Sequence, residues 1–394
     1  MTRLTFTNGF LTDASIGDLS NPAPKKYSFI NGLCVGVSDA TGLSKTQGIF
    51  KFVNGILVST GSFTSGSVTP PPPSSNIWVA GGLIIGDNHR LAYSYDGLNW
   101  THLTSVYFTS GGICTNGNMF VAVGQGYNTE VFAYSTDGLN WTKVSNNNTP
   151  QCVAWNGTRF VAAGLGEYAH PDRCVFDSTD GVNWHVQNSH LIGNISTIAW
   201  NGNMFVIGGS LPDSSFGTTI NTMAYSSDGL GWTGLGKTIF TTNCSGVATN
   251  GFVWVAVGNG TNSIAYSTDG TNWTGLGTSI FTGNGQSICW NGTMFVAGGT
   301  GTNKFAYSYD GINWTGLGNP LSYDIGTPQS IATCIWWDGS KFIAGSDNLA
   351  FPYLSENTLG YSIDGINWTG LGTGFFPAWN SIVSNHAPAL IPPV

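Results

Sequence analysis

Seven aspartates recur in one sequence context along the chain. Each lies in a segment that reads Ser-x-Asp-Gly-x-Asn-Trp, except that Gly231 replaces the Asn of the fourth segment. A calcium site needs several oxygen ligands that converge on one point, whereas each segment offers a single carboxylate. Turn capping, with the carboxylate accepting backbone N–H groups, is therefore the favoured interpretation, and we expect no metal. The aspartates are Asp96, Asp137, Asp180, Asp228, Asp269, Asp310 and Asp364.

Other residue types that catalyse reactions are scarce. The chain has three glutamates, four arginines and six histidines, and no Ser/His/Asp or Cys/His arrangement stands out from chance spacing. With only three glutamates, the chain offers few candidates for the pair of carboxylates that a glycoside hydrolase uses. We expect no catalytic residue, no cofactor and no enzymatic activity. A cryptic glycoside hydrolase is the least favoured alternative.

The seven cysteines are an odd number spread over 300 residues. Five of them precede an expected turn by an even number of residues, which places them on one face of equivalent strands. We interpret them as small buried side chains in a reducing compartment, with disulfides as the minor alternative. These five are Cys114, Cys152, Cys244, Cys289 and Cys334.

The elements that position these residues repeat along the chain. The tryptophans that end the seven segments lie 41 to 54 residues apart, a period typical of four-stranded propeller blades. Between consecutive segments, Asn-Gly or Asp-Gly separates two apolar runs, which is a strong hairpin signal. We predict strands at 287–290, 294–298, 304–308 and 313–318 in one such unit. The six hairpin dipeptides begin at Asn116, Asn156, Asn201, Asn250, Asn291 and Asp338.

This repetition predicts an all-β fold, with residues 77–394 forming a seven-bladed β-propeller of four-stranded blades. The first unit lacks an Asn-Gly hairpin, whereas Pro377-Ala-Trp-Asn-Ser-Ile-Val383 resembles the start of a first strand. We therefore expect residues 379–383 to supply that strand and close the ring.

The first 76 residues have a shorter repeat. Phe6, Phe29 and Phe52 each begin a Phe-x-Asn-Gly motif, which predicts three β-hairpins. Three hairpins bury little apolar area alone, so we expect residues 1–63 to anchor the protein to a larger assembly. Residues 64–76 contain Pro70-Pro71-Pro72-Pro73 and form a Ser/Pro-rich linker.

The seven segments resemble the Asp-box (BNR) repeat of sialidase-like propellers, Ser-x-Asp-x-Gly-x-Thr-Trp. The version here is one residue shorter and carries Asn in place of Thr, so the turn geometry is open. The resemblance implies that the Asp braces a turn and that the Trp packs between blades. Sialidase activity would need the arginine triad of that family. The chain has only four arginines, and Arg3 lies outside the expected propeller, so we expect no such triad.

The loops between the second and third strands of the units vary most in length, and they collect the rare charged residues. In a propeller these loops share the face opposite the Asp segments. The favoured interpretation is that exposed loops gather charged residues without any specific function. The second interpretation is a binding face for a glycan or a protein. The candidate ligand-binding residues are His89, Arg90, Tyr127, Glu130, Glu167, Tyr168, His170, Arg173, Tyr353 and Glu356.

Only 8% of the residues are charged and the formal net charge is −8, without the basic stripe that nucleic acids require. No run approaches the length of a membrane span, and no signal peptide is visible. The Asn/Gly/Thr/Ser-rich repeats look like virion proteins of large DNA viruses and phages. We therefore expect a non-enzymatic virion structural protein, assembled in the host cytoplasm, that contacts other virion proteins through residues 1–63. Its propeller head would contact protein, glycan or a host surface, and a carbohydrate-binding lectin-like propeller is the alternative.

Overall fold

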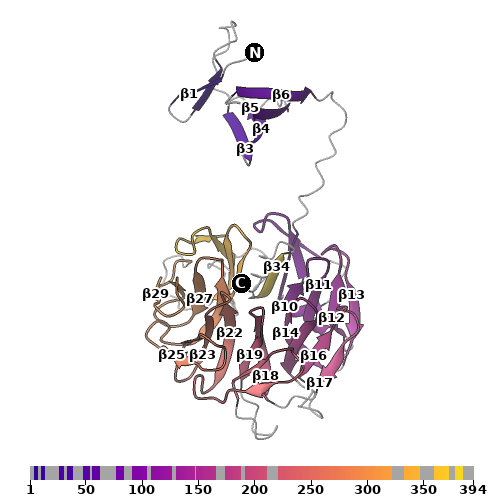
Figure 1. The fold of residues 1–394 in the computed structure, drawn as a ribbon, viewed down its shortest axis with the longest axis vertical. Coiled ribbons are helices and arrows are strands. Elements are labelled where there is room, and N and C mark those ends of the chain that lie inside the picture. Colours follow the sequence, from indigo (N-terminus) through magenta and orange to yellow (C-terminus); the bar gives the residue numbers. More distant parts are fainter. Residues whose placement is uncertain are drawn as a thin grey trace, which may run out of the picture. The chain divides into compact units, whose positions relative to one another are not determined.

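The computed structural model describes the strands within residues 4–62. Beyond them it describes residues 77–83, 91–103, 108–126, 130–146, 148–165, 174–187, 191–210, 221–321, 332–346, 359–371 and 378–384. The chain divides into two compact units, Met1–Pro73 and Ser74–Val394. Every regular element in these ranges is a β-strand (Figure 1), and among the described residues no helix is long and apolar enough to span a membrane.

The first unit contains the three expected strand pairs. β1 (Leu4–Thr7) pairs antiparallel with β2 (Phe10–Asp13). β3 (Lys26–Ile30), β4 (Leu33–Ser38), β5 (Gly48–Val53) and β6 (Ile56–Ser62) form one four-stranded sheet in that order. Each Asn-Gly dipeptide lies between the two strands that pair, as the hairpin signal predicted.

The second unit is a propeller-like arrangement of small antiparallel sheets, most of them four-stranded and one twelve-stranded. The four-stranded sheets run β34-β7-β8-β9, β10 to β13, β26 to β29 and β30 to β33. β14 to β25 form the twelve-stranded sheet, in which runs of four strands are joined by single residue pairs, Leu165 with Asn194 and Ser210 with Asn243.

The strands of this unit are β7 (Trp78–Leu83), β8 (Leu91–Ser94), β9 (Trp100–His102), β10 (Phe108–Thr115), β11 (Phe120–Gly126), β12 (Glu130–Ser135), β13 (Thr142–Ser145), β14 (Thr149–Trp155), β15 (Phe160–Leu165), β16 (Val175–Ser178), β17 (His185–Gln187), β18 (Asn194–Trp200), β19 (Phe205–Ser210), β20 (Met223–Ser226), β21 (Thr233–Gly234), β22 (Asn243–Thr249), β23 (Trp254–Asn259), β24 (Ile264–Ser267), β25 (Thr274–Gly275), β26 (Gly285–Trp290), β27 (Phe295–Gly299), β28 (Phe305–Ser308), β29 (Thr315–Gly316), β30 (Ala332–Trp337), β31 (Phe342–Ser346), β32 (Leu359–Ser362), β33 (Thr369–Gly370) and β34 (Ala378–Ser384).

The first strands of successive four-stranded runs contact one another in a closed cycle. The order is β10, β14, β18, β22, β26, β30 and β34, and β34 contacts β10. β34 also pairs antiparallel with β7, with Trp379 opposite Gly82 and Val383 opposite Val79. This is the pairing expected from the sequence, by which the carboxyl-terminal strand joins the first sheet.

The Asn-Gly hairpins turn on the glycine and the residue after it. In the β14–β15 hairpin, the backbone N–H of Asn156 donates to the carbonyl oxygen of Arg159, and Gly157 has a φ of 97°. Oδ1 of Asn156 accepts the N–H groups of Thr158 and Arg159. The asparagine therefore flanks the turn and closes it with its side chain, and the glycine is one of the two central residues.

The hydrophobic core lies between neighbouring runs of strands. One cluster joins Val121 and Phe132 of the β10–β13 sheet to Phe160 and Phe176 of the next run. The ring of Trp184 stacks on Phe132 of the preceding sheet, with centroids 4.3 Å apart. The tryptophan of this segment thus packs between neighbouring sheets, as the resemblance implied.

Candidate functional site

The carboxylates of the seven Ser-x-Asp-Gly segments are occupied within their own turns. In the segment of Asp310, Oδ1 accepts the backbone N–H groups of Ile312 (2.8 Å) and Asn313 (2.7 Å) and the hydroxyl of Ser308 (3.0 Å). Oδ2 accepts the side-chain amide of Asn313 at 2.8 Å. The same pattern recurs in the other segments, apart from the missing amide at Gly231. These aspartates therefore brace turns.

This hydrogen bonding stabilises the charged carboxylates. Partial burial acts to raise the pKa of Asp96, but bonds from the backbone and side chain of Asn99 and from Leu98 and Ser94 lower it to about 2. The pKa values of Asp137, Asp310 and Asp364 are also lowered to about 2. Among the described residues, no group of three or more His, Cys, Asp or Glu side chains is placed to hold a metal ion.

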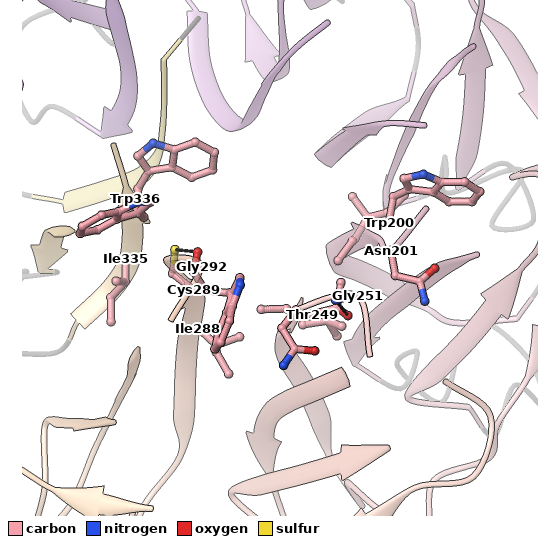
Figure 2. A pocket seen from close by; sticks show the side chains of 16 residues that line it. Trp200, Asn201, Thr249, Gly251, Ile288, Cys289, Gly292, Ile335 and Trp336 are labelled. Carbon is pink, nitrogen blue, oxygen red and sulfur yellow. Dashed lines mark hydrogen bonds between the residues drawn. The ribbon is translucent and has the colours of Figure 1, made fainter. Parts of the chain in front are cut away.

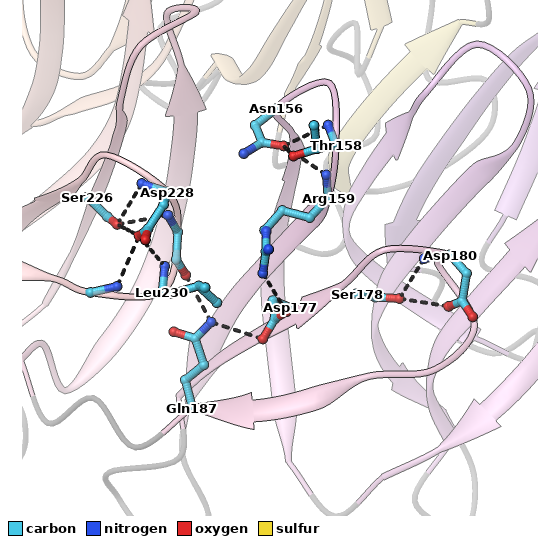
Figure 3. Close-up of polar contacts among 12 residues, drawn as sticks. Asn156, Thr158, Arg159, Asp177, Ser178, Asp180, Gln187, Ser226, Asp228 and Leu230 are labelled. Atoms are coloured by element: carbon cyan, nitrogen blue, oxygen red, sulfur yellow. Dashed lines mark hydrogen bonds and ion pairs between the residues drawn. The ribbon is translucent and has the colours of Figure 1, made fainter.

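A polar cluster beside the fourth segment links two runs of strands (Figure 3). Arg159 pairs with Asp177 at 3.0 Å, and the side-chain amide of Gln187 donates to Asp177 and to the carbonyl oxygen of Gly229. In six segments the indole N–H of the Trp donates to the glycine carbonyl, but Trp232 Nε1 is buried with no partner. In the fourth segment the carbonyl oxygen of Gly229 accepts a hydrogen bond from the side chain of Gln187 instead. The cluster therefore has a structural role.

The residues predicted for the loop face fall mostly outside the described ranges. His89, Arg90, Tyr127, Glu167, Tyr168, His170, Arg173, Tyr353 and Glu356 lie there. Glu130 is the first residue of β12 and forms an ion pair with Lys143 of β13. It therefore holds together two strands of one sheet, and the proposed loop site stays a prediction.

A cavity of about 390 Å³ lies at the ends of the first strands of four successive runs. Its volume is at the lower end of the range of small-molecule sites, roughly 300–1,000 Å³. Figure 2 shows Trp200 and Trp336 on opposite sides of the opening, with Thr249, Ile288 and Cys289 between them. Four indoles and four branched aliphatic side chains contribute to the lining: Trp200, Trp290, Trp336, Trp337, Ile198, Val247, Ile288 and Ile335.

The last residue of the first strand differs among the runs. The last residue of the first strand is Trp155, Trp200, Trp290 or Trp337 in four of the runs, and each indole packs on the Phe that it opposes, with centroids 4.5 to 4.7 Å apart. In β10 the position is Thr115, which opposes Phe120, and in β22 it is Thr249, which opposes Trp254.

The neighbouring strand β18 presents a small side chain beside β22. Ala199 of β18 packs against the cluster that contains Val247 and Trp254, so a methyl group faces β22 at this level. Trp254 itself is 1% exposed and is not among the residues that line the cavity. Ala199 of β18 and Thr249 of β22 are thus small side chains in the lining of the cavity.

The polar groups of the cavity are uncharged at neutral pH. Oδ1 of Asn201 and Oδ1 of Asn250 each accept two backbone N–H groups of their turns, whereas their amide nitrogens have no partner among the described residues. Thr249 Oγ1 donates to the carbonyl of Val253 and accepts the N–H of Gly251. Burial raises the pKa of Cys289 to about 12, which keeps its thiol protonated.

The cavity lies at the end of the strands that carries the Asn-Gly turns, because Asn201, Asn250, Gly251 and Gly292 contribute to its lining. The aspartate segments turn the chain at this same end, since they follow the third strand of each run. Sequence reasoning placed the candidate site at the opposite end. The usable signal in the sequence was the tryptophans that precede the Asn-Gly and Asp-Gly turns, such as Trp200, Trp290 and Trp337, which line the cavity.

No family model matches the chain, and no curated protein matches it in sequence. Among solved structures, a chain of a nidogen/laminin complex is similar at 9% identity, with a TM-score of 0.43 over 79% of this chain and 98% of that one. YCF48 from Cyanidioschyzon merolae is similar at 12% identity, with a TM-score of 0.46 over 70% of this chain and 94% of that one. Similarities at this level carry no argument about function.

Proposed function

We propose that residues 77–394 form a seven-bladed β-propeller of Asp-box type that acts as a non-enzymatic binding head. The closed cycle of contacts from β10 to β34 supports seven blades, with the twelve-stranded sheet counted as three of them. The bracing of each turn by its Ser and Asp supports the relation to Asp-box repeats.

Binding without catalysis is supported by the state of the ionisable groups. The aspartates of the repeat are held charged by their turn hydrogen bonds, so none is poised to exchange a proton near neutral pH. The 16 residues that line the cavity include no Asp, Glu, Lys, Arg or His. The occupied carboxylates are the observation that carries this proposal.

The biological setting that we propose is a virion, with the protein as a capsid-surface, fibre or appendage component. The support is the charge-poor, Asn/Gly/Thr/Ser-rich composition and the hairpin-rich residues 1–63, which would bind other virion proteins. Mass spectrometry of purified particles should detect the protein, and deletion of residues 1–63 should release it. A full-length protein that is absent from particles in the infected cell would refute this setting.

A carbohydrate-binding propeller is the second candidate. The observation that favours it is the cavity, in which indoles and free amide nitrogens lie together without charge. The two functions are compatible, because the head of a virion appendage can bind a glycan on the host surface.

A further inference from the structure

We propose that the cavity at the ends of β18, β22, β26 and β30 is a binding site for an uncharged pyranose unit of a glycan. This inference rests on the proposed binding function and specifies its ligand and its location. It places the site at the end of the strands that carries the Asn-Gly turns, opposite the loops singled out from the sequence.

The indoles provide the apolar part of the recognition. One face of a pyranose ring presents C–H groups, which pack on the electron-rich face of an aromatic ring. Trp200, Trp290 and Trp337 are each fixed against a Phe of the next strand, so their orientation is set before a ligand arrives. Such preorganisation reduces the entropy that binding costs.

The polar groups match the hydroxyls of a sugar. The amide nitrogens of Asn201 and Asn250 remain available as donors because the turns use only the amide oxygens. A ligand rich in oxygen satisfies these groups better than a hydrocarbon does.

The lack of charge in the lining selects among glycans. A sialic acid carboxylate or a sulfate would lose its hydration in the cavity without meeting a cationic side chain among the 16 lining residues. Neutral hexoses and N-acetylhexosamines do not carry this penalty. The site therefore differs in its ligand from a sialidase pocket.

Phe252 is an exposed aromatic residue next in sequence to Gly251, which lines the cavity. It follows Asn250 and Gly251 in the turn after β22 and is 70% exposed. The equivalent turn residues are Asn118, Thr158, Asn203, Thr293 and Ser340, all polar. The turn after β22, whose Asn250 and Gly251 line the cavity, thus also carries an exposed aromatic ring.

A variant that tests the site by reducing the cavity can copy a pair of residues that the protein already contains in other runs. The double change Thr249→Trp and Trp254→Phe recreates the Trp-on-Phe pair of Trp200 with Phe205 and of Trp290 with Phe295. Because Thr249 lines the cavity, the new indole would take up part of its volume. Two controls are Trp254→Phe alone and Thr115→Trp, because Thr115 opposes Phe120 in β10 and does not line the cavity.

The full-length protein and its variants would be applied to an array of neutral and sialylated glycans. The best neutral oligosaccharide would then be titrated by calorimetry, with circular dichroism and the thermal unfolding midpoint as checks of folding. We expect neutral glycans to bind, the double variant to bind at least about tenfold more weakly, and both controls to stay within about twofold. Phe252→Ser should also weaken binding, whereas Val186→Ser, an exposed residue of β17, should not.

Three results would overturn the inference: no neutral glycan bound by the folded protein, binding restricted to anionic glycans, or equal binding by the double variant. If the folded protein binds no neutral glycan but is still found in particles, the virion role stands and only this site is refuted. If the protein is absent from particles but binds neutral glycans through this cavity, the site stands and the virion setting fails.

Discussion

At the scale of single residues, the one segment that differs from the other six allows the contribution of a single hydrogen bond to be measured. Six Asp segments share an Asn whose amide donates to the carboxylate, and the fourth has Gly231 instead. A Cβ added at Gly231 would meet no atom within 4 Å, and its φ is not in the left-handed region. Gly231→Asn should therefore stabilise the protein by about 0.5–1.5 kcal/mol, by adding one hydrogen bond to Asp228 and restricting the unfolded chain.

The thermal unfolding midpoint of Gly231→Asn measures this gain. Asn272→Gly is the matched control, since it removes the same bond from Asp269 and should lower the midpoint by a similar amount. A midpoint for Gly231→Asn at or below that of the unchanged protein would show that the amide does not stabilise the turn.

At the scale of strands, one run departs from the others through a pair of charges. Arg159 stands where Met119, Met204 and Met294 stand in other runs, and Asp177 replaces a Tyr such as Tyr225. The ion pair is partly buried, with 25% of the Arg159 side chain and 10% of the Asp177 side chain exposed. Either residue left alone would keep a poorly solvated charge.

Restoring the repeat residues tests this substitution. Asp177→Tyr and Arg159→Met should each lower the free energy of unfolding by about 1–3 kcal/mol, whereas the double variant should lose less than the sum of the two. Chemical denaturation of all four proteins gives the coupling energy. A coupling no larger than that of Glu130 with Lys143, a more exposed pair, would show that the charges act independently.

Strand order was predictable from the sequence because its signals are local. The Asn-Gly and Asp-Gly hairpins fix which strands pair, and the likeness of residues 377–383 to a first strand indicated the pairing of β34 with β7. The fourth strand is shorter than the predicted 313–318, since β29 spans Thr315–Gly316. The cavity could not be predicted in this way, because its lining comes from four runs, β18, β22, β26 and β30, which are brought together only by the contacts between their first strands.

At the scale of the whole molecule, the seven aspartate segments make stability depend on pH in one direction. Their folded-state pKa values lie below the ordinary value, near 2 for Asp96, Asp137, Asp310 and Asp364. A carboxylate of this kind contributes stability above its unfolded pKa of about 4, and this contribution is lost as the pH falls toward the folded pKa. The free energy of unfolding should therefore be nearly constant from pH 7 to about 5 and fall steadily between about pH 4 and 2.

Denaturation by urea at a series of pH values measures this dependence. Asp310→Asn removes one titrating group, so the variant should be less stable at pH 7 but lose less of its stability on acidification than the unchanged protein does. Because the seven segments share the same hydrogen-bond pattern, their aspartates should protonate over the same pH interval. Acidification should therefore weaken all the runs of strands together. A free energy of unfolding that stays level down to about pH 2.5 would contradict a stabilising role for the charged aspartates.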